Sequence, residues 1–245
     1  MSSTESVAAA AAVFIFAGLV KGVIGLGLPT LSMALLALWM RPVEAAALLI
    51  VPSLVTNVWQ LRPWSALGPV WRRVGGLQVG IAMGTLGGAA LFGVPAAGDG
   101  AHKLLGAALL AYAAWGLAGR PVQVPARHER WAGVLVGVLT GAVTALTGVF
   151  VVPAVPYLQA LGLQREALIQ AMGLSFTTAT VTLAIGLAGN GSAGVSALPL
   201  SVAMLLPALA GMTFGQWLRE RLPLVVFRRC FFGALALLGG YMLAG

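Results

Sequence analysis

The sequence is divided into ten apolar segments, and short gaps between them hold most of the charged residues. A helix needs about 20 apolar residues to cross a bilayer, and several segments reach or approach that length. Only 8% of the 245 residues are charged, against ~25% in a soluble domain, which is too few to cover a water-facing surface. These features predict an all-α polytopic integral membrane protein. The segments are Val7–Lys21, Leu26–Met40, Glu44–Leu61, Val74–Gly93, Ala101–Ala118, Trp131–Leu146, Val149–Leu161, Ala167–Leu187, Leu198–Trp217 and Phe227–Ala244.

The segment lengths repeat once along the chain as two short segments followed by three long ones. Residue identities support a duplication, because the sequence from Gly18 to Gly22 aligns with that from Gly137 to Gly141, and Ser53 with Ser175. We therefore expect a single membrane domain made of two repeats, residues 1–120 and 121–245.

The basic gaps predict the orientation of the repeats. Residues 62–73, 120–130 and 219–229 hold most of the Lys and Arg, which marks them as cytoplasmic. The short pairs, of about 13 to 16 residues per segment, are too short to cross comfortably, so we expect each pair to be half-helices that enter and return, or a tilted, broken pair. Each half then makes an odd number of crossings. This predicts inverted-topology repeats with both termini outside, as in many secondary transporters.

Glycine-bearing breaks interrupt the two short pairs, at residues 22–27 and 141–148. Non-helical backbone at membrane depth is tolerated only where it is buried in protein or lines a wet cavity. A half-helix that starts after such a turn directs free N–H groups and its positive dipole end into the membrane, which favours an anion. The alternative is that Gly18, Gly22, Gly137 and Gly141 only allow close helix packing.

Lys21 is a basic residue inside an apolar stretch, at the first break. A charge in the membrane costs about 3 kcal/mol or more on insertion scales, which favours a functional role such as pairing with an anion. The alternative is that the Lys21 side chain extends to the membrane interface or binds the carbonyls at a helix end. Its repeat mate is Thr140, so the site would be asymmetric in charge. Other polar residues near the breaks either line a site or join helices; they include Thr56, Asn57, Gln60, Thr144, Thr147 and Ser175.

The acidic residues do not predict catalysis. Glu44 and Glu166 fall at equivalent helix starts, where a carboxylate is stabilised by the helix dipole, and proton coupling is the alternative role. No nucleotide-binding glycine loop and no intramembrane cluster of His, Cys and acidic residues occurs. We therefore expect a protein that is not an enzyme, with no cofactor, no metal and no nucleic acid as partner.

The glycine-rich strings resemble the TauE/SafE sulfite-exporter family. The first copy is carried by Gly18-Leu-Val-Lys-Gly-Val-Ile-Gly-Leu-Gly27, Pro42-Val-Glu-Ala-Ala46 and Asn57-Val-Trp-Gln-Leu-Arg62, and the second by Gly137-Val-Leu-Thr-Gly141 and Arg165-Glu-Ala167. The resemblance implies a bacterial inner-membrane permease for sulfite, thiosulfate or organosulfonates, acting in many members as an exporter.

Together these observations predict a secondary transporter that binds a small anion near mid-membrane and moves one repeat against the other. A passive anion channel or an auxiliary membrane subunit is the alternative. The expected partners are the anion, the lipid bilayer and, if the protein is not a monomer, a second copy. The predicted substrate-binding residues are Lys21, Gly22, Gly25, Gly27, Asn57, Gln60, Thr140, Thr144, Thr147, Gly148 and Ser175.

Overall fold

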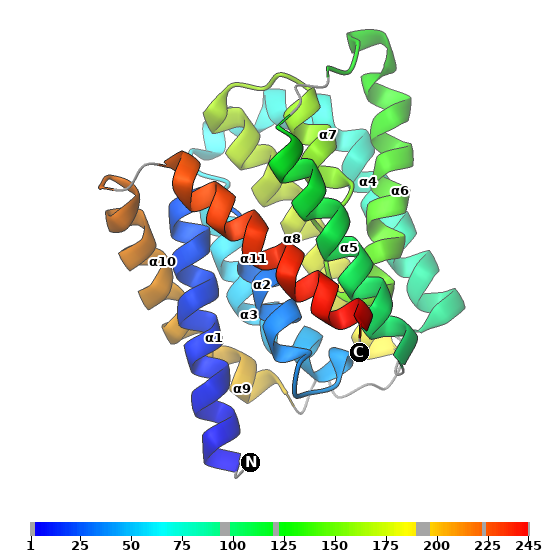
Figure 1. Cartoon of the computed structure of the whole chain (residues 1–245). Helices are drawn as coiled ribbons and strands as arrows, with labels where there is room; N and C mark the ends of the chain where they lie inside the picture. The colour runs from blue at the N-terminus through cyan, green and yellow to red at the C-terminus, as the bar shows by residue number, and fades with distance from the viewer. Residues whose placement is uncertain (1–2, 94–98, 120–122, 190–196, 222–223, 245) are drawn as a thin grey trace.

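The computed structural model describes residues 3–93, 99–119, 123–189, 197–221 and 224–244, and these residues form helices and no strands. The helices are drawn in Figure 1. They are α1 (Ser3–Ile24), α2 (Leu28–Leu36), α3 (Pro42–Trp59), α4 (Leu67–Phe92), α5 (Asp99–Ala118), α6 (Glu129–Thr147), α7 (Ala154–Ala160), α8 (Arg165–Gly189), α9 (Leu198–Ala203), α10 (Leu205–Arg219) and α11 (Leu224–Ala244), with 3₁₀ turns η1 (Trp64–Ala66) and η2 (Ala126–His128).

Apolar side chains cover much of the outer surface of this bundle. Among the described residues, seven helical stretches are long and apolar enough to cross a membrane. Leu91, Leu206 and Leu237 are between 74% and 79% exposed, an arrangement that suits hydrocarbon and not water. The prediction of an all-α polytopic membrane protein is confirmed.

The two short pairs differ from the prediction, because only the second member of each pair is short. α1 has 22 residues and α6 has 19, so both are long enough to cross, whereas α2 has nine and α7 has seven. Gly22 and Gly141 do not break these helices; the chain leaves α1 only after Ile24 and α6 only after Thr147. By length the first members are therefore not half-helices, and of the two predicted alternatives the tilted, broken pair remains.

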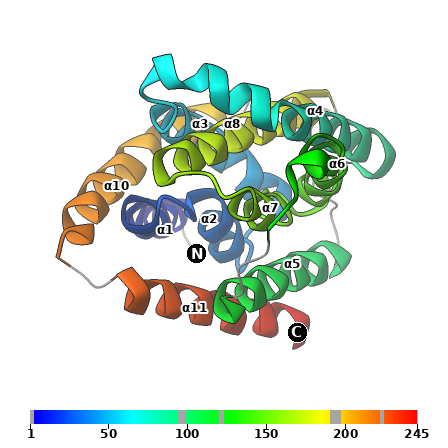
Figure 2. The same ribbon diagram turned by 90° about the horizontal axis from the view of Figure 1, so that it is seen from above.

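The short helices lie at the centre of the bundle. Seen from above in Figure 2, α2 and α7 are surrounded by α1, α6, α3, α8 and the pair α5 and α11, while α10 lies at one edge. In Figure 1, α2 lies in the lower part of the molecule and α7 in the upper part, and both chain termini lie toward the lower end. The membrane face at that end, like the inverted repeat, stays a prediction.

Glycines bring helices from the two halves into backbone contact. A Cβ atom on Gly18 or Gly22 of α1 would collide with the backbone of α10, and one on Gly211 or Gly215 of α10 would collide with that of α1. Helix α6 packs in the same way against α4, where a Cβ on Gly141 would meet the carbonyl of Ile81. Without a hydrophobic effect between helices in lipid, such close packing is a main source of association. Gly18, Gly22, Gly137 and Gly141 thus have a packing role.

Two glycines on α4 provide a matched test of this packing. A Cβ on Gly84 would collide with the carbonyl of Val138 on α6, whereas a Cβ on Gly87 would meet no atom within 4 Å. We expect Gly84→Ala to lower the free energy of unfolding in detergent by about 1–3 kcal/mol, the usual cost of overpacking. Gly87→Ala should leave it unchanged or slightly higher, since Ala is the better helix former. Equal effects of the two substitutions would contradict the proposed contact.

Candidate functional site

The break between α1 and α2 contains two glycines whose backbone conformation any other residue would adopt only with strain. Gly25 and Gly27 have φ angles of +83° and +111°, in the left-handed region. The amide of Gly25 still donates to the carbonyl of Lys21 at 2.7 Å, so the last turn of α1 closes before the chain turns. Lys21 is therefore held one turn before the break.

Helix α3 presents a polar face to this break. Ser53, Thr56, Asn57 and Gln60 are spaced i, i+3, i+4 and i+7, which places them on one side of the helix. The Lys21 Nζ donates to Thr56 Oγ1 at 3.0 Å and to Asn57 Oδ1. Gln60 Nε2 donates to the carbonyl of Gly25 at 2.8 Å, so it satisfies backbone that the break leaves open. The structure thus brings Lys21, Gly25, Asn57 and Gln60 together, as the sequence predicted for one site.

Pro52 lies inside the helix that carries this polar face. Proline has no N–H, so the carbonyl of Leu48 loses its helical partner. Ser201 of α9 replaces it, because its Oγ donates to Leu48 O at 2.8 Å and accepts from the amide of Val51 at 3.1 Å. A residue of the second half therefore satisfies the backbone of α3 at this proline.

The electrostatics of this site are those of a buried cation without a carboxylate. Lys21 is 3% exposed. The ion pairs observed among the described residues are Arg41–Glu44 and Arg73–Glu129, and neither involves Lys21. Two side-chain donors of α3, Asn57 Nδ2 and Ser53 Oγ, are buried and have no hydrogen-bond partner. Buried donors are rarely left unpaired, so a cation and unpaired donors on one site fit an anion.

The second break does not share these features. The hydroxyls of Thr140, Thr144 and Thr147 donate to the carbonyls four residues earlier in α6, at 2.7 to 2.8 Å. Gly148 has a φ of +70° and ends the helix. The structure shows no hydrogen bond from these three hydroxyls to Lys21, so the two breaks do not form one cluster in this conformation.

Each break lies beside the short helix of the other half. A Cβ on Gly148 would meet the side chain of Met33 from α2. Conversely, Gln159 of α7 lines the same cavity as Ile24 and Leu26 at the first break. The short helices therefore extend past one another at the centre of the molecule.

Ser175, another predicted site residue, joins two helices. Its Oγ accepts from Gln78 Nε2 of α4 at 3.0 Å and donates to the carbonyl of Ala171 at 2.9 Å. It lies on α8 at the position equivalent to Ser53, but its hydrogen bonds are made within the protein. The position equivalent to Asn57 is Ala179. The second half thus has a weaker set of free donors than the first.

Two carboxylates lie where the sequence predicted them. Glu44 is in the first turn of α3 and Glu166 in the first turn of α8. Glu44 accepts two hydrogen bonds from Arg41, at 2.6 and 2.9 Å, on an exposed surface. No contact of Glu44 with the Lys21 site is present among the described residues.

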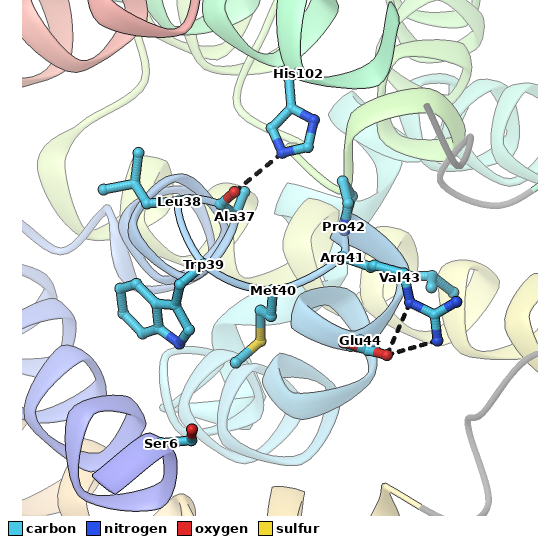
Figure 3. Close-up of a pocket in the computed structure, with 10 residues that line it drawn as sticks. All are labelled: Ser6, Ala37, Leu38, Trp39, Met40, Arg41, Pro42, Val43, Glu44 and His102. Carbon is cyan, nitrogen blue, oxygen red and sulfur yellow. Dashed lines mark hydrogen bonds and ion pairs between the residues drawn. The ribbon is translucent and has the colours of Figure 1, made fainter. Parts of the chain in front are cut away.

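A cavity of about 680 Å³ lies at the lower end of the bundle, and Figure 3 shows its lining. It is formed by the connection from α2 to α3, with Ser6 of α1 and His102 of α5. One ring nitrogen of His102 lies 3.0 Å from the carbonyl of Ala37, and Arg41 pairs with Glu44. The cation of this cavity is therefore already neutralised by a neighbouring carboxylate.

Sequence reasoning missed two groups of residues. Ser53 was used only to align the repeats, although its spacing from Asn57 and Gln60 along one helix face could have identified it. The second group is Arg165, Arg219 and Arg228. Arg165 carries part of the family resemblance, and Arg219 and Arg228 lie in a basic gap that predicts orientation, but none of them is a predicted substrate-binding residue. The structure brings these three arginines to one cavity, and no spacing within a single segment signals that.

An all-α bundle of membrane-spanning helices, with two breaks and a buried cation at one of them, is the architecture of a polytopic membrane transport protein. The model of the sulfite exporter TauE/SafE family matches residues 10–242, nearly the whole chain. The chain therefore belongs to the TauE/SafE sulfite exporter family, which consists of membrane transporters of the anion-exporter type. No curated protein and no solved structure gives a significant match.

The hydrogen bond from Gln60 to the first break is open to a direct test. We expect Gln60→Leu to lower the free energy of unfolding in detergent by about 1–3 kcal/mol, because the carbonyl of Gly25 loses its donor. Gln216→Leu, at an exposed position on α10, should change it by about 0.5 kcal/mol or less. If Gln60→Leu were as stable as the wild type, Gln60 would not be holding the break.

Proposed function

We propose that this chain is a secondary transporter that exports small sulfur-containing anions, such as sulfite, thiosulfate or organosulfonates, across the bacterial inner membrane. The observation that carries the proposal is the buried Lys21 without a carboxylate partner. Membership of the TauE/SafE family supports the anion class.

The chemistry around Lys21 suits an oxyanion with several acceptor oxygens. An ammonium group has three donors, and Thr56 and Asn57 receive two of them, so one remains. Asn57 Nδ2 and Ser53 Oγ add two neutral donors from the same face of α3. Charge-assisted hydrogen bonds are about twice as strong as neutral ones, so Lys21 would supply affinity while the amide and the hydroxyl orient the anion.

The described conformation is closed around this site. Lys21, Asn57 and Ser53 are all buried, at 0% to 3% exposure, so an anion cannot reach them without movement of the surrounding helices. A carrier needs such an occluded conformation between its two open ones. The predicted residues of the second break, Thr140, Thr144, Thr147 and Gly148, would come into contact with the anion only in another conformation.

A passive channel is the competing function. A carrier saturates with substrate and shows stimulated exchange when anion is present on both sides, whereas an open pore shows neither. Counterflow of ³⁵S-labelled thiosulfate in proteoliposomes with the purified chain separates the two. Flux that rises linearly with concentration would contradict the carrier.

The two lysines of the sequence provide a matched test of the binding site. We expect Lys21→Met to reduce labelled sulfite and thiosulfate transport by roughly tenfold or more, the loss that removal of a contact worth about 1.4 kcal/mol produces. Lys103→Met removes the same charge at an exposed position of α5 and should transport normally. Initial rates in proteoliposomes at equal protein content provide the comparison.

The melting temperature of Lys21→Met distinguishes a functional role of Lys21 from a structural one. If the role is functional, the melting temperature should stay within a few degrees of the wild type, because removing a buried charge that has no ionic partner should not greatly destabilise the fold. Normal transport by this variant would remove Lys21 from the mechanism. A variant that loses transport only because it unfolds would show a large fall in melting temperature.

A further inference from the structure

Three arginines from separate parts of the chain line one cavity beside the first break. Arg165 begins α8, Arg219 ends α10, and Arg228 lies near the start of α11. The cavity has a volume of about 220 Å³, and Gln159 of α7 adds a polar group to its wall. This volume accommodates a small oxyanion together with water.

Within the described chain no acidic side chain lines this cavity. The ion pairs Arg41–Glu44 and Arg73–Glu129 do not involve its arginines. Glu166 and Glu220 are sequence neighbours of these arginines, but neither lines the cavity. Clustered like charges repel one another, so the arrangement is stabilised when an anion enters.

Helix stability does not explain the position of Arg165. It is the first residue of α8, where a positive charge opposes the helix dipole. Arg228 is held in place by an aromatic contact, since its guanidinium carbon lies 5.9 Å from the centre of the Phe232 ring, which also lines the cavity. Arg165 thus lies at a position that suits an anion better than it suits the helix.

The cavity reaches the break that carries the Lys21 site. Its inner wall includes Val23, Ile24 and Leu26, which follow Lys21 by two, three and five residues. Val23 and Ile24 belong to the same last turn of α1 as Lys21. The opposite end of the bundle differs, because the cation of its cavity, Arg41, is paired with Glu44.

We infer that the cavity lined by Arg165, Arg219 and Arg228 is an anion-loading site on the face that carries the basic loops, one step before the Lys21 site. The inference rests on the proposed function. The arginines recognise a sulfur oxyanion through its charge and oxygens, and the apolar wall of the break keeps it from Lys21 until the helices move. Among the described residues, the arginines of this cavity have no carboxylate partner, whereas Arg41 in the cavity at the opposite end is paired with Glu44, so capture is favoured from one face of the membrane.

Side-resolved transport tests the loading site. In vesicles of known orientation, Arg219→Gln and Arg228→Gln should each raise the half-saturating concentration of ³⁵S-thiosulfate by about three- to tenfold from the face of residues 219–229. The maximal rate and the opposite face should be unaffected. The matched control is Arg221→Gln, because Arg221 lies 3.8 Å from the Trp217 ring and does not line the cavity. If all three variants behaved alike, the inference would be overturned.

Chemical protection provides a readout that does not depend on transport. Phenylglyoxal modification of Arg165, Arg219 and Arg228, mapped by mass spectrometry, should slow when methanesulfonate is present, and modification of Arg221 should not. Absence of selective protection would overturn the loading site even where Lys21→Met abolishes transport. Selective protection without any transport of labelled anion would retain the site and contradict the proposed function.

An anionic lipid headgroup presents the same oxyanion chemistry to the arginines. The protection experiment is therefore performed in phosphatidylcholine vesicles and in vesicles that also contain phosphatidylglycerol. Protection by methanesulfonate in phosphatidylcholine alone supports a loading site for a free anion. Protection that requires phosphatidylglycerol and does not respond to methanesulfonate assigns the cavity to lipid and overturns the inference.

Discussion

Lipid offers no hydrogen bonds to a polypeptide, and this constraint governs where the chain can depart from a helix. Both breaks lie inside the bundle, and protein groups satisfy their exposed backbone. Gln60 donates to the carbonyl of Gly25, and the Thr147 hydroxyl accepts from the amide of Val149. The same logic applies at Pro52, where Ser201 replaces the missing helical donor. Irregular backbone is thus tolerated where side chains of the same helix or of another helix satisfy its polar groups.

The two halves use similar breaks for different chemistry. At the second break, threonine hydroxyls donate to carbonyls of their own helix. At the first break, the donors Asn57 Nδ2 and Ser53 Oγ have no hydrogen-bond partner and lie on the helix face that binds the buried Lys21. The alignment of the two halves predicts a shared backbone arrangement. At aligned positions the first half has Lys21 and Asn57 where the second has Thr140 and Ala179, so the first half is more polar and charged. A site of this kind needs few charged residues, which agrees with the low charge content of the chain.

The sequence was sufficient for the membrane class, because segment length and the scarcity of charge leave little alternative. It also predicted that Lys21, Asn57 and Gln60 lie near one another at the first break, since polar groups at membrane depth are costly and therefore conspicuous. It failed for the ends of α1 and α6, because Gly22 and Gly141 resemble helix breakers but are accommodated by backbone contact with α10 and α4. It could not predict the arginine cavity, which depends on how the start of α8 meets the end of α10 and the first turns of α11.

The glycine contacts determine which helices can move together. Helix α1 lies against α10, and α6 lies against α4, with no side chain between their backbones at the glycines. Movement of residues 1–120 as one block relative to residues 121–245 would separate both of these interfaces. The close backbone contacts would then be lost, and lipid would not replace them. We therefore expect the moving units to be mixed assemblies, each containing helices from both ends of the sequence, and not the two repeats that the sequence predicts.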